Sequence, residues 1–153
     1  MRALIQRVSL ASVSVEGHPV AAIKQGLVVL LGVRIGDAAA DASYLAEKII
    51  NLRIFPDLSG KLNLSLLDIG AEVLVVSQFT LLANTRKGRR PSFTEAAPPE
   101  AAEPLIETFV QDLRFAGLEP QTGSFQKHML VEIHNDGPVT ILIDSEDRFK
   151  PRH

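Results

Sequence analysis

Alternating apolar and polar residues at both ends of the chain predict β-strands there. A turn at residues 16–19 joins the first two of these strands into a hairpin. The apolar run at residues 26–33 lies between glycines and predicts a strand buried on both faces. The strands predicted by the pattern are residues 3–15, 20–23, 26–33, 72–82, 129–134 and 139–144.

Two segments carry apolar residues at the spacing of three and four that is typical of a half-buried helix. The first stripe consists of Ala42, Leu45, Ala46, Ile49 and Leu52, with Asp37 as the expected cap. The second consists of Ala102, Leu105, Ile106, Phe109, Val110 and Leu113, with Gly117 as the expected end. Pro104 must lie in the first turn of this helix or kink it, because a later proline loses a backbone hydrogen bond. Residues 62–67 fit either a strand or a helix.

Strands that outnumber two main helices predict an α/β (α+β) fold, with a curved, mixed, largely antiparallel sheet or partial barrel. The length of 153 residues suits a single domain with its own core. We place this domain at residues 1–145 and expect residues 146–153 to form a loose polar tail.

Composition excludes several kinds of site. The absence of cysteine excludes disulfides, thiolate-bound zinc and thiol catalysis. Charged residues interrupt the first apolar positions, and no run approaches the roughly 18 apolar residues of a membrane helix. We therefore expect a cytoplasmic protein without membrane contact. The net charge of −2 requires any contact with nucleic acid to be local.

One loop has the charge for such a contact. Arg86, Lys87, Arg89 and Arg90 place four cations within five residues, and Pro91 limits the flexibility of the loop. The pattern fits a solvated surface loop and a phosphate-binding loop equally well.

Polar residues interrupt the apolar strand predicted at residues 72–82. Gln78 and Thr80 would share one face and Ser77 and Phe79 the other, because side chains alternate along a strand. A buried amide or hydroxyl without a partner costs about 1–3 kcal/mol. These residues therefore either bond to neighbouring strands or form a site, and the strand alone leaves both open.

The segment Asn135-Asp136-Gly137-Pro138-Val139-Thr140 contains an Asp-Gly pair that favours a hairpin turn. Pro138 is unusual there, because proline removes a ladder donor at the start of a strand. Only about 5–6% of X-Pro bonds in folded proteins are cis, so the residues alone predict a trans bond.

The common catalytic motifs are absent. The four histidines are scattered, and no paired-histidine metal motif, nucleophile elbow, dinucleotide fingerprint or phosphate loop occurs. If the chain is an enzyme, we expect it to work without a metal, a cofactor or a side-chain triad.

The two polar motifs together resemble the D-aminoacyl-tRNA deacylase family, which carries Ser-Gln-x-Thr and Asn-x-Gly-Pro-x-Thr. Residues 5–8, 51–55, 60–63 and 87–93 are similar to the family as well. The family usually has Gly-x-Phe-Gly-Ala-x-Met before the penultimate strand. This chain keeps Phe125 and Met129 but has Gln126 and Lys127 in place of the two small residues. The effect of this change on the pocket is left open.

The resemblance implies a homodimer that acts on the 3′ end of aminoacyl-tRNA, with sites near the subunit interface. It implies that the Gly137–Pro138 bond is cis, reaches the partner's pocket and selects one handedness, with Arg7 holding it. Ser77, Gln78 and Thr80 would wall the pocket for the 3′ adenosine and the aminoacyl group. The implied reaction is hydrolysis of D-aminoacyl-tRNA, and glycyl-tRNA mischarged on tRNA(Ala) would also be accepted because glycine has no side chain to reject.

For the mechanism, backbone N–H groups near Phe79 and Thr80 suit a developing oxyanion. No His or Lys neighbours Thr80 in sequence to activate it, so we favour assistance by the RNA 2′-hydroxyl, with a Thr80 nucleophile as the alternative. A non-catalytic dimeric tRNA-binding module and a small-molecule esterase are the competing functions. The missing triad and the basic loop argue against the esterase.

Overall fold

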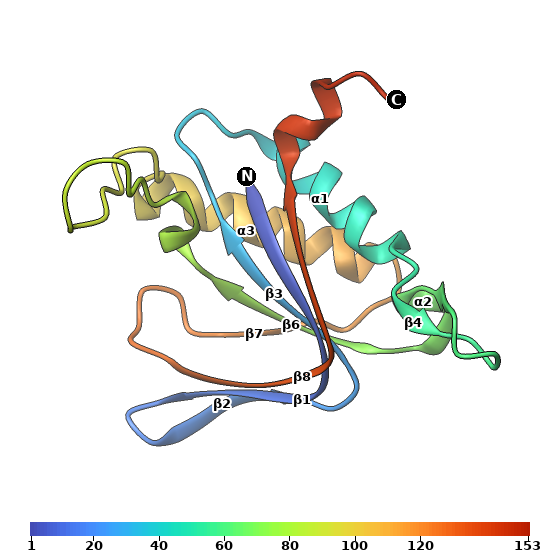
Figure 1. Ribbon diagram of the computed structural model, residues 1–153. Coiled ribbons are helices and arrows are strands. Elements are labelled where there is room, and N and C mark those ends of the chain that lie inside the picture. The colour runs from blue at the N-terminus through green and yellow to red at the C-terminus, as the bar shows by residue number, and fades with distance from the viewer.

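A six-stranded sheet forms the centre of the computed structural model, which describes residues 1–153 (Figure 1). Its strands follow the order β2-β1-β3-β6-β7, in which β1 pairs with β3 through residues 2–8 and with β2 through residues 11–15. β8 pairs with β1 along almost its whole length. The strands are β1 (Arg2–Val15), β2 (His18–Ile23), β3 (Gly26–Gly32), β6 (Glu72–Ser77), β7 (Gln121–Thr122) and β8 (Leu130–Asp144).

The sheet is mixed. β1 runs antiparallel to β2, β3 and β8, whereas β6 runs parallel to both β3 and β7. The long strands β1 and β8 bend near their middles, so that the sheet curves strongly (Figure 1). Their register shifts between Gln6 and Val8 and again between Val8 and Leu10, as expected where bulges bend a strand. The predicted curved, mixed, largely antiparallel sheet is confirmed.

The two predicted main helices are present, and both cover the same face of the sheet (Figure 1). They are α1 (Ala39–Asn51) and α3 (Pro99–Phe115). The remaining elements are short: the pair β4 (Phe55–Pro56) and β5 (Leu62–Leu64), the helix α2 (Leu66–Ile69), and the 3₁₀ helices η1 (Phe79–Leu82) and η2 (Ser145–Phe149). None of the helices has both the length and the apolar content required to cross a membrane.

Two hydrophobic clusters lie on opposite faces of the sheet. The larger one packs Leu45 of α1 and Phe109 of α3 against the sheet. The smaller one lies on the other face and contains Val8 and Leu74. Neighbouring residues of β3 belong to different clusters, because successive side chains of a strand point to opposite faces. This explains why β3 is apolar without interruption.

The strand predicted at residues 72–82 is too long. β6 ends at Ser77, and the chain then turns into η1, where Leu81 N–H donates to the Gln78 carbonyl at 3.2 Å. The partner strand β3 ends at Gly32, so the residues beyond Gln78 have no ladder to join. A Cβ at Gly32 would lie 2.9 Å from the Gln78 carbonyl oxygen, so the turn packs directly on this glycine.

The prediction of two strands joined by a turn at residues 135–138 is also wrong. β8 is a single strand of 15 residues, and both of its halves pair with β1. Residues 136–139 form a bulge between the pairs Val8–Asn135 and Gln6–Thr140. The length of β1 decides this outcome, because one 14-residue strand offers partners to both halves.

The first helix begins differently from the prediction. Ala38, not Asp37, occupies the N-cap, and the Asp41 carboxylate accepts a hydrogen bond from Ala38 N–H at 2.9 Å. Asp37 instead accepts from Arg34 N–H at 2.6 Å and lies 2.8 Å from the amino group of Met1. A tertiary ion pair therefore replaces the expected cap.

The structure also places three further segments whose conformation the sequence left open or predicted differently. Pro104 lies in the second turn of α3, since that helix already begins at Pro99. Residues 62–67 contain both β5 and the start of α2. The expected loose tail is ordered over η2, where Ser145 is buried and Arg148 lies 3.2 Å from the Asp41 carboxylate.

Candidate active site

The turn that follows β6 brings the first polar motif together. Ser77 and Gln78 are half-buried, whereas Phe79 and Thr80 are exposed. The side-chain amide of Gln78 donates a hydrogen bond to the hydroxyl of Thr80. The two side chains therefore meet, as the strand pattern predicted, although a 3₁₀ turn and not a strand places them.

The basic loop starts directly after this turn. Asn84 and Ser92 close its base through two backbone hydrogen bonds of 2.7 and 2.9 Å. Phe93 then packs its ring against Phe79 in a T-shaped pair with centroids 5.1 Å apart. The predicted cations Arg86, Lys87, Arg89 and Arg90 are all exposed, and none forms an ion pair. The turn and the loop are thus one connected unit that carries free positive charge.

Two cavities lie against the same turn and share Ser77, Phe79 and Gln126. One, of about 380 Å³, extends towards the start of α3 and is also lined by Phe125. The other, of about 350 Å³, extends towards β8 and is also lined by Met129. Both volumes suit a small ligand group, since such sites span roughly 300–1,000 Å³. The structure therefore groups the predicted residues Phe125 and Met129 with Ser77 and Phe79.

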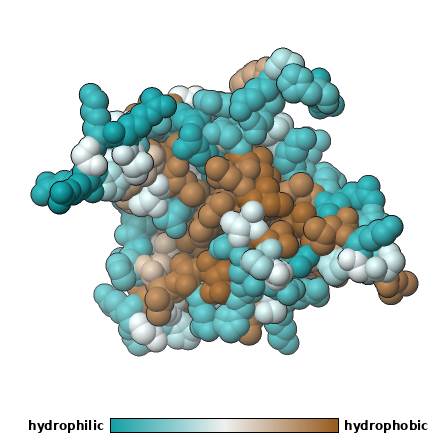
Figure 2. Space-filling view, in the orientation of Figure 1, coloured by the Kyte–Doolittle hydropathy of each residue, from teal (hydrophilic) through white to brown (hydrophobic).

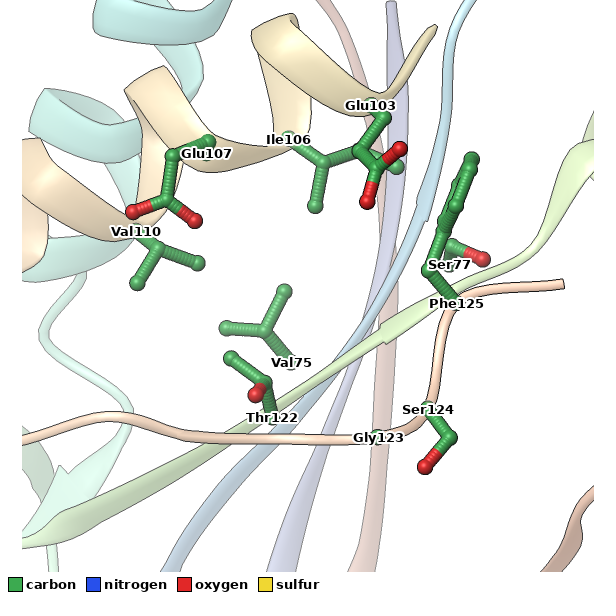
Figure 3. A pocket seen from close by; sticks show the side chains of 10 residues that line it. All are labelled: Val75, Ser77, Glu103, Ile106, Glu107, Val110, Thr122, Gly123, Ser124 and Phe125. Carbon is green, nitrogen blue, oxygen red and sulfur yellow. The ribbon is translucent and has the colours of Figure 1, made fainter. Parts of the chain in front are cut away.

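A third cavity, of about 260 Å³, lies beneath α3. Figure 3 shows Glu103 and Glu107 projecting from the helix towards Val75 and Ser77 of β6, with the ring of Phe125 beside Ser77. Ser77 lines all three cavities, and Phe125 lines this one and the cavity of about 380 Å³. The two glutamates could not be predicted from the sequence, because an acidic residue on a helix is ordinarily a solvated surface residue.

The second polar motif forms the bulge of β8. Val139 N–H donates to the side-chain oxygen of Asn135 at 3.0 Å, which closes the bulge on itself. The Thr140 hydroxyl accepts from Asn135 at 2.8 Å and from Gln6 of β1 at 3.2 Å. The Gly137–Pro138 peptide bond is cis, as the resemblance implies. The trans bond predicted from the residues alone is wrong, because an average over all X-Pro bonds carries no information about a proline in a bulge.

Arg7 lies beneath this bulge with 11% of its side chain exposed. Its Nε donates to the carbonyl of Asp136 at 3.0 Å, and its Nη1 donates to the carbonyl of Ile54 at 2.7 Å. Gly137 has a φ of +134°, and a Cβ there would lie 3.0 Å from Nη2 of Arg7. Only glycine fits this position, because the backbone conformation and the close guanidinium both exclude a side chain.

The turn and the bulge do not meet within one chain. Arg7, level with the bulge, pairs with Leu27 of β3, whereas Ser77 pairs with Leu31, four residues further along. Three strand spacings separate β8 from β6 in the order β8-β1-β3-β6. At about 3.3 Å per residue and 4.8 Å per strand, the offsets are roughly 13 Å along the strands and 14 Å across them.

Comparison with known proteins assigns the chain to a family. The sequence profile described as D-Tyr-tRNA(Tyr) deacylase matches residues 4–144. The chain belongs to this deacylase family. A D-aminoacyl-tRNA deacylase from Dehalococcoides mccartyi is 61% identical over 152 residues, which cover 99% of each chain.

Two solved structures share the fold of this chain. The c-Myc DNA Unwinding Element Binding Protein superimposes with a TM-score of 0.88 at 42% identity, over 94% of this chain and 98% of that one. A probable eukaryotic D-amino acid tRNA deacylase gives a TM-score of 0.80 over the same shares of the two chains. Its identity of 16% supports likeness of fold alone.

The departure from the deacylase family pattern lies at the rim of the two shared cavities. Gln126 has a φ of +62°, in the left-handed region that glycine adopts at little cost. The family's usual glycine at this position is therefore explained by the backbone. Lys127 stands where the family usually has alanine, and its side chain is exposed.

Arg2, which lies next to the Ser77–Thr80 turn, was not predicted from the sequence. Arg2 donates from Nη1 to the Leu81 carbonyl at 3.0 Å and from Nε to the Asp144 carboxylate at 3.0 Å. Arg34 also contacts Asp144, at 3.3 Å. Burial raises the pKa of Asp144, but hydrogen bonds from the Glu146 N–H and from the two arginines outweigh it, and the net pKa lies below its ordinary value. No local pattern marks Arg2, because its partners lie 79 and 142 residues away.

Proposed function

We propose that this chain hydrolyses the ester bond of D-aminoacyl-tRNA in the cytoplasm, releases the free D-amino acid and tRNA, and so removes wrongly charged tRNA. The observation that carries the proposal is the meeting of the cavities on the Ser77–Thr80 turn, beside a loop of unpaired cations. The cavities can receive the aminoacyl-adenosine end, and the loop can contact RNA phosphates. Membership of the deacylase family supports the same reaction.

The complete site requires a second copy of the chain in this proposal. The Gly137–Pro138 bulge and the Ser77–Thr80 turn are too far apart to meet within one chain. We therefore propose that the bulge of one copy reaches the turn of its partner. An apolar row also crosses the face of the sheet opposite α1 and α3, where Leu4 pairs with Leu142 of β8 and Leu30 of β3. Leu142 is 58% exposed, and apolar side chains gather in the middle of this face (Figure 2). A homodimer would bury this row and bring the two motifs together.

Chiral selection follows from exclusion at the bulge. We propose that the carbonyl groups of Gly137 and Pro138 hold the amino group of the substrate, so that an L side chain would clash with the bulge. Each 1.36 kcal/mol of difference gives about tenfold selectivity, so roughly 4 kcal/mol yields about 10³. A steric clash together with a lost hydrogen bond supplies a difference of this size. Glycyl-tRNA, including glycine mischarged on tRNA(Ala), carries no side chain to exclude and is accepted.

The chemistry uses backbone groups and the substrate's own hydroxyl. The N–H groups of Phe79 and Thr80 begin η1 and have no partner further back in that turn, which leaves them available for an oxyanion. The Thr80 hydroxyl accepts a hydrogen bond from the Gln78 amide, which is a donor and not a base. Thr80 is therefore poorly suited to be a nucleophile. The free 2′-hydroxyl of the terminal ribose takes the role of positioning or activating water, and no metal takes part.

The test measures release of D-tyrosine and L-tyrosine from matched charged tRNAs, with and without a chelator, for the wild type and Thr80→Val. We expect D-tyrosine release that resists chelation, a large preference over L-tyrosine, and activity retained in Thr80→Val in single-turnover conditions. Complete loss of the chemical step in a folded Thr80→Val variant would favour the nucleophile. Equal release of both enantiomers would refute the chiral filter.

A non-catalytic nucleic-acid-binding dimer is the second candidate. The four unpaired cations at residues 86–90 favour it, and so does the likeness to the c-Myc DNA Unwinding Element Binding Protein, which is similar in fold and 42% identical. This function predicts tRNA binding that weakens with salt but no ester cleavage. The release assay separates the two candidates directly.

A further inference from the structure

The segment between β7 and β8 forms a tight turn at the rim of the cavity of about 350 Å³. Lys127 N–H donates to the Ser124 carbonyl at 3.2 Å, which closes the turn. Gln126 takes the left-handed conformation inside it, with a φ of +62°. The turn thereby fixes Lys127 in the wall of the cavity that also contains Gln78 and Phe79.

The rest of this cavity suits a nucleoside. Val76, Met129 and Val131 provide an apolar surface, and the Gln78 amide adds a polar group. The ring of Phe79 is 57% exposed at the edge. Exposed aromatic rings of this kind stack on nucleobases, and the stacking tolerates any base.

Lys127 adds a charge where the nucleoside would join the rest of the RNA. It is the one lysine or arginine in the wall of this cavity, which contains no carboxylate. Its ammonium group forms no ion pair within the chain. His128 lies beside it, and the cations of residues 86–90 follow the Phe79 turn. A free ammonium on a flexible stem is suited to a phosphate, which it meets as a point charge.

We propose that Lys127 binds the phosphate group on the 5′ side of the terminal adenosine of the substrate. This assignment rests on the proposed function and names a contact of the same site. The apolar cavity wall and Phe79 hold the nucleoside, and Lys127 holds the phosphate that joins it to the preceding nucleotide. The strength of the contact is modest, because Lys127 is exposed and its charge is screened by water and salt.

The test compares two minimal substrates, the D-tyrosyl ester of adenosine and the D-tyrosyl ester of adenosine 5′-monophosphate, together with D-tyrosyl-tRNA. For each variant, kcat/KM with the phosphate is divided by kcat/KM without it. We expect this ratio to fall roughly three- to tenfold in Lys127→Ala and Lys127→Gln, and to recover partly in Lys127→Arg. Lys24→Ala is the matched control, because Lys24 is an exposed lysine near the opposite end of β6, and its ratio should equal the wild-type ratio.

The salt dependence gives an independent measure. The slope of log(1/KM) against log[salt] for D-tyrosyl-tRNA should be shallower in Lys127→Ala by somewhat less than one, the change expected for one lost phosphate contact. An unchanged phosphate ratio in folded Lys127→Ala and Lys127→Gln would overturn the assignment while wild-type cleavage upholds the proposed function. A wild type that cleaves none of the three esters would overturn both.

Discussion

The guanidinium of Arg2 donates a hydrogen bond to the carbonyl of Leu81 at 3.0 Å and so ties the first strand to the turn that carries Thr80. The same guanidinium pairs with Asp144 at the end of β8. Arg2 therefore links three segments that are distant in sequence. Because it does not line the cavities, we regard it as a positioning residue.

Arg2→Lys should separate the two contacts. A lysine can pair with Asp144, but its single ammonium cannot hold the carboxylate and the Leu81 carbonyl in the geometry of a guanidinium. We expect kcat to fall roughly tenfold, equivalent to about 1.4 kcal/mol, with a smaller change in KM and a melting temperature within a few degrees of wild type. Steady-state kinetics and thermal unfolding check this. A loss of stability without any change in kcat would show that the contact with Leu81 does not position the turn.

Asp144 makes the stability of the fold sensitive to acid. Its pKa is lowered in the folded state, so folding favours the charged carboxylate. The resulting stabilisation is complete above the ordinary carboxyl pKa of about 3.9 and is lost as the pH falls through the lower pKa of the folded state. Urea denaturation from pH 7 to pH 2.5 should show this decline. Asp144→Asn should lower the free energy of unfolding at pH 7 by roughly 1–3 kcal/mol and flatten the decline below pH 4.

Asp41 is expected to contribute part of the acid dependence of stability that remains in Asp144→Asn, and Asp57 and Asp68, whose pKa values are also lowered, contribute as well. Burial raises the pKa of Asp41, but hydrogen bonds from Ala38 and Ser145 and the charge of Arg148 lower it by more. The net pKa therefore lies below its ordinary value. A variant Asp144→Asn with the same acid dependence as wild type would show that Asp144 is not a principal source of it.

Sequence patterns predicted the presence of helices and strands more successfully than the residues at which they end. The stripe that includes Leu45 and Ile49 predicted α1, because half-buried helices carry that spacing whatever they pack against. The end of β6 could not be predicted, because Leu82 is fully buried and fits a strand pattern as well as the 3₁₀ turn it adopts. The end of β3 at Gly32 determines where β6 ends, and Gly32 lies 45 residues before Ser77 in the sequence.

The candidate site shows the same division. The motifs at Ser77 and Gly137 predicted both polar clusters, since short polar runs in apolar strands are visible locally. The cavities were not predictable, because α3 and the turn at Gln126 form their opposite walls. The sequence predicts a hairpin where β8 has a bulge, because Asp136-Gly137 is a local turn signal. The long strand β1, which pairs with both halves of β8, leaves no signal in the sequence near Gly137.

Gln126→Gly should stabilise the protein. A left-handed residue other than glycine costs about 1–2 kcal/mol, and the greater flexibility of glycine in the unfolded chain offsets roughly 0.5–1 kcal/mol of the gain. We expect the free energy of unfolding to rise by about 0.5–1 kcal/mol in urea denaturation. Gln111→Gly within α3 is the control and should lower it by about 1 kcal/mol. Destabilisation by both changes would mean that the side chain of Gln126 makes contacts worth more than its backbone cost.

Arg7→Lys should weaken chiral selection if the bulge is the filter. Lysine cannot donate to the carbonyls of Asp136 and Ile54 with the same fork, so the position of Gly137 becomes less fixed. We expect the ratio of kcat/KM for D-tyrosyl-tRNA over L-tyrosyl-tRNA to fall roughly tenfold. Arg53→Lys is a matched control, because Arg53 also donates to a carbonyl, that of Asn63 at 2.9 Å. Identical ratios in the two variants would argue against a role of Arg7 in selection.

The pairing of β8 with β1 on both sides of its bulge also determines how the molecule can move. A hairpin tip can fray by itself, but a segment flanked by Val8–Asn135 and Gln6–Thr140 opens only when the surrounding sheet opens. The amide hydrogen of Val139, bonded to Asn135, should therefore exchange with deuterated solvent almost as slowly as those of β1, although it lies near the surface. An incoming substrate would then meet a rigid bulge that keeps its shape on entry.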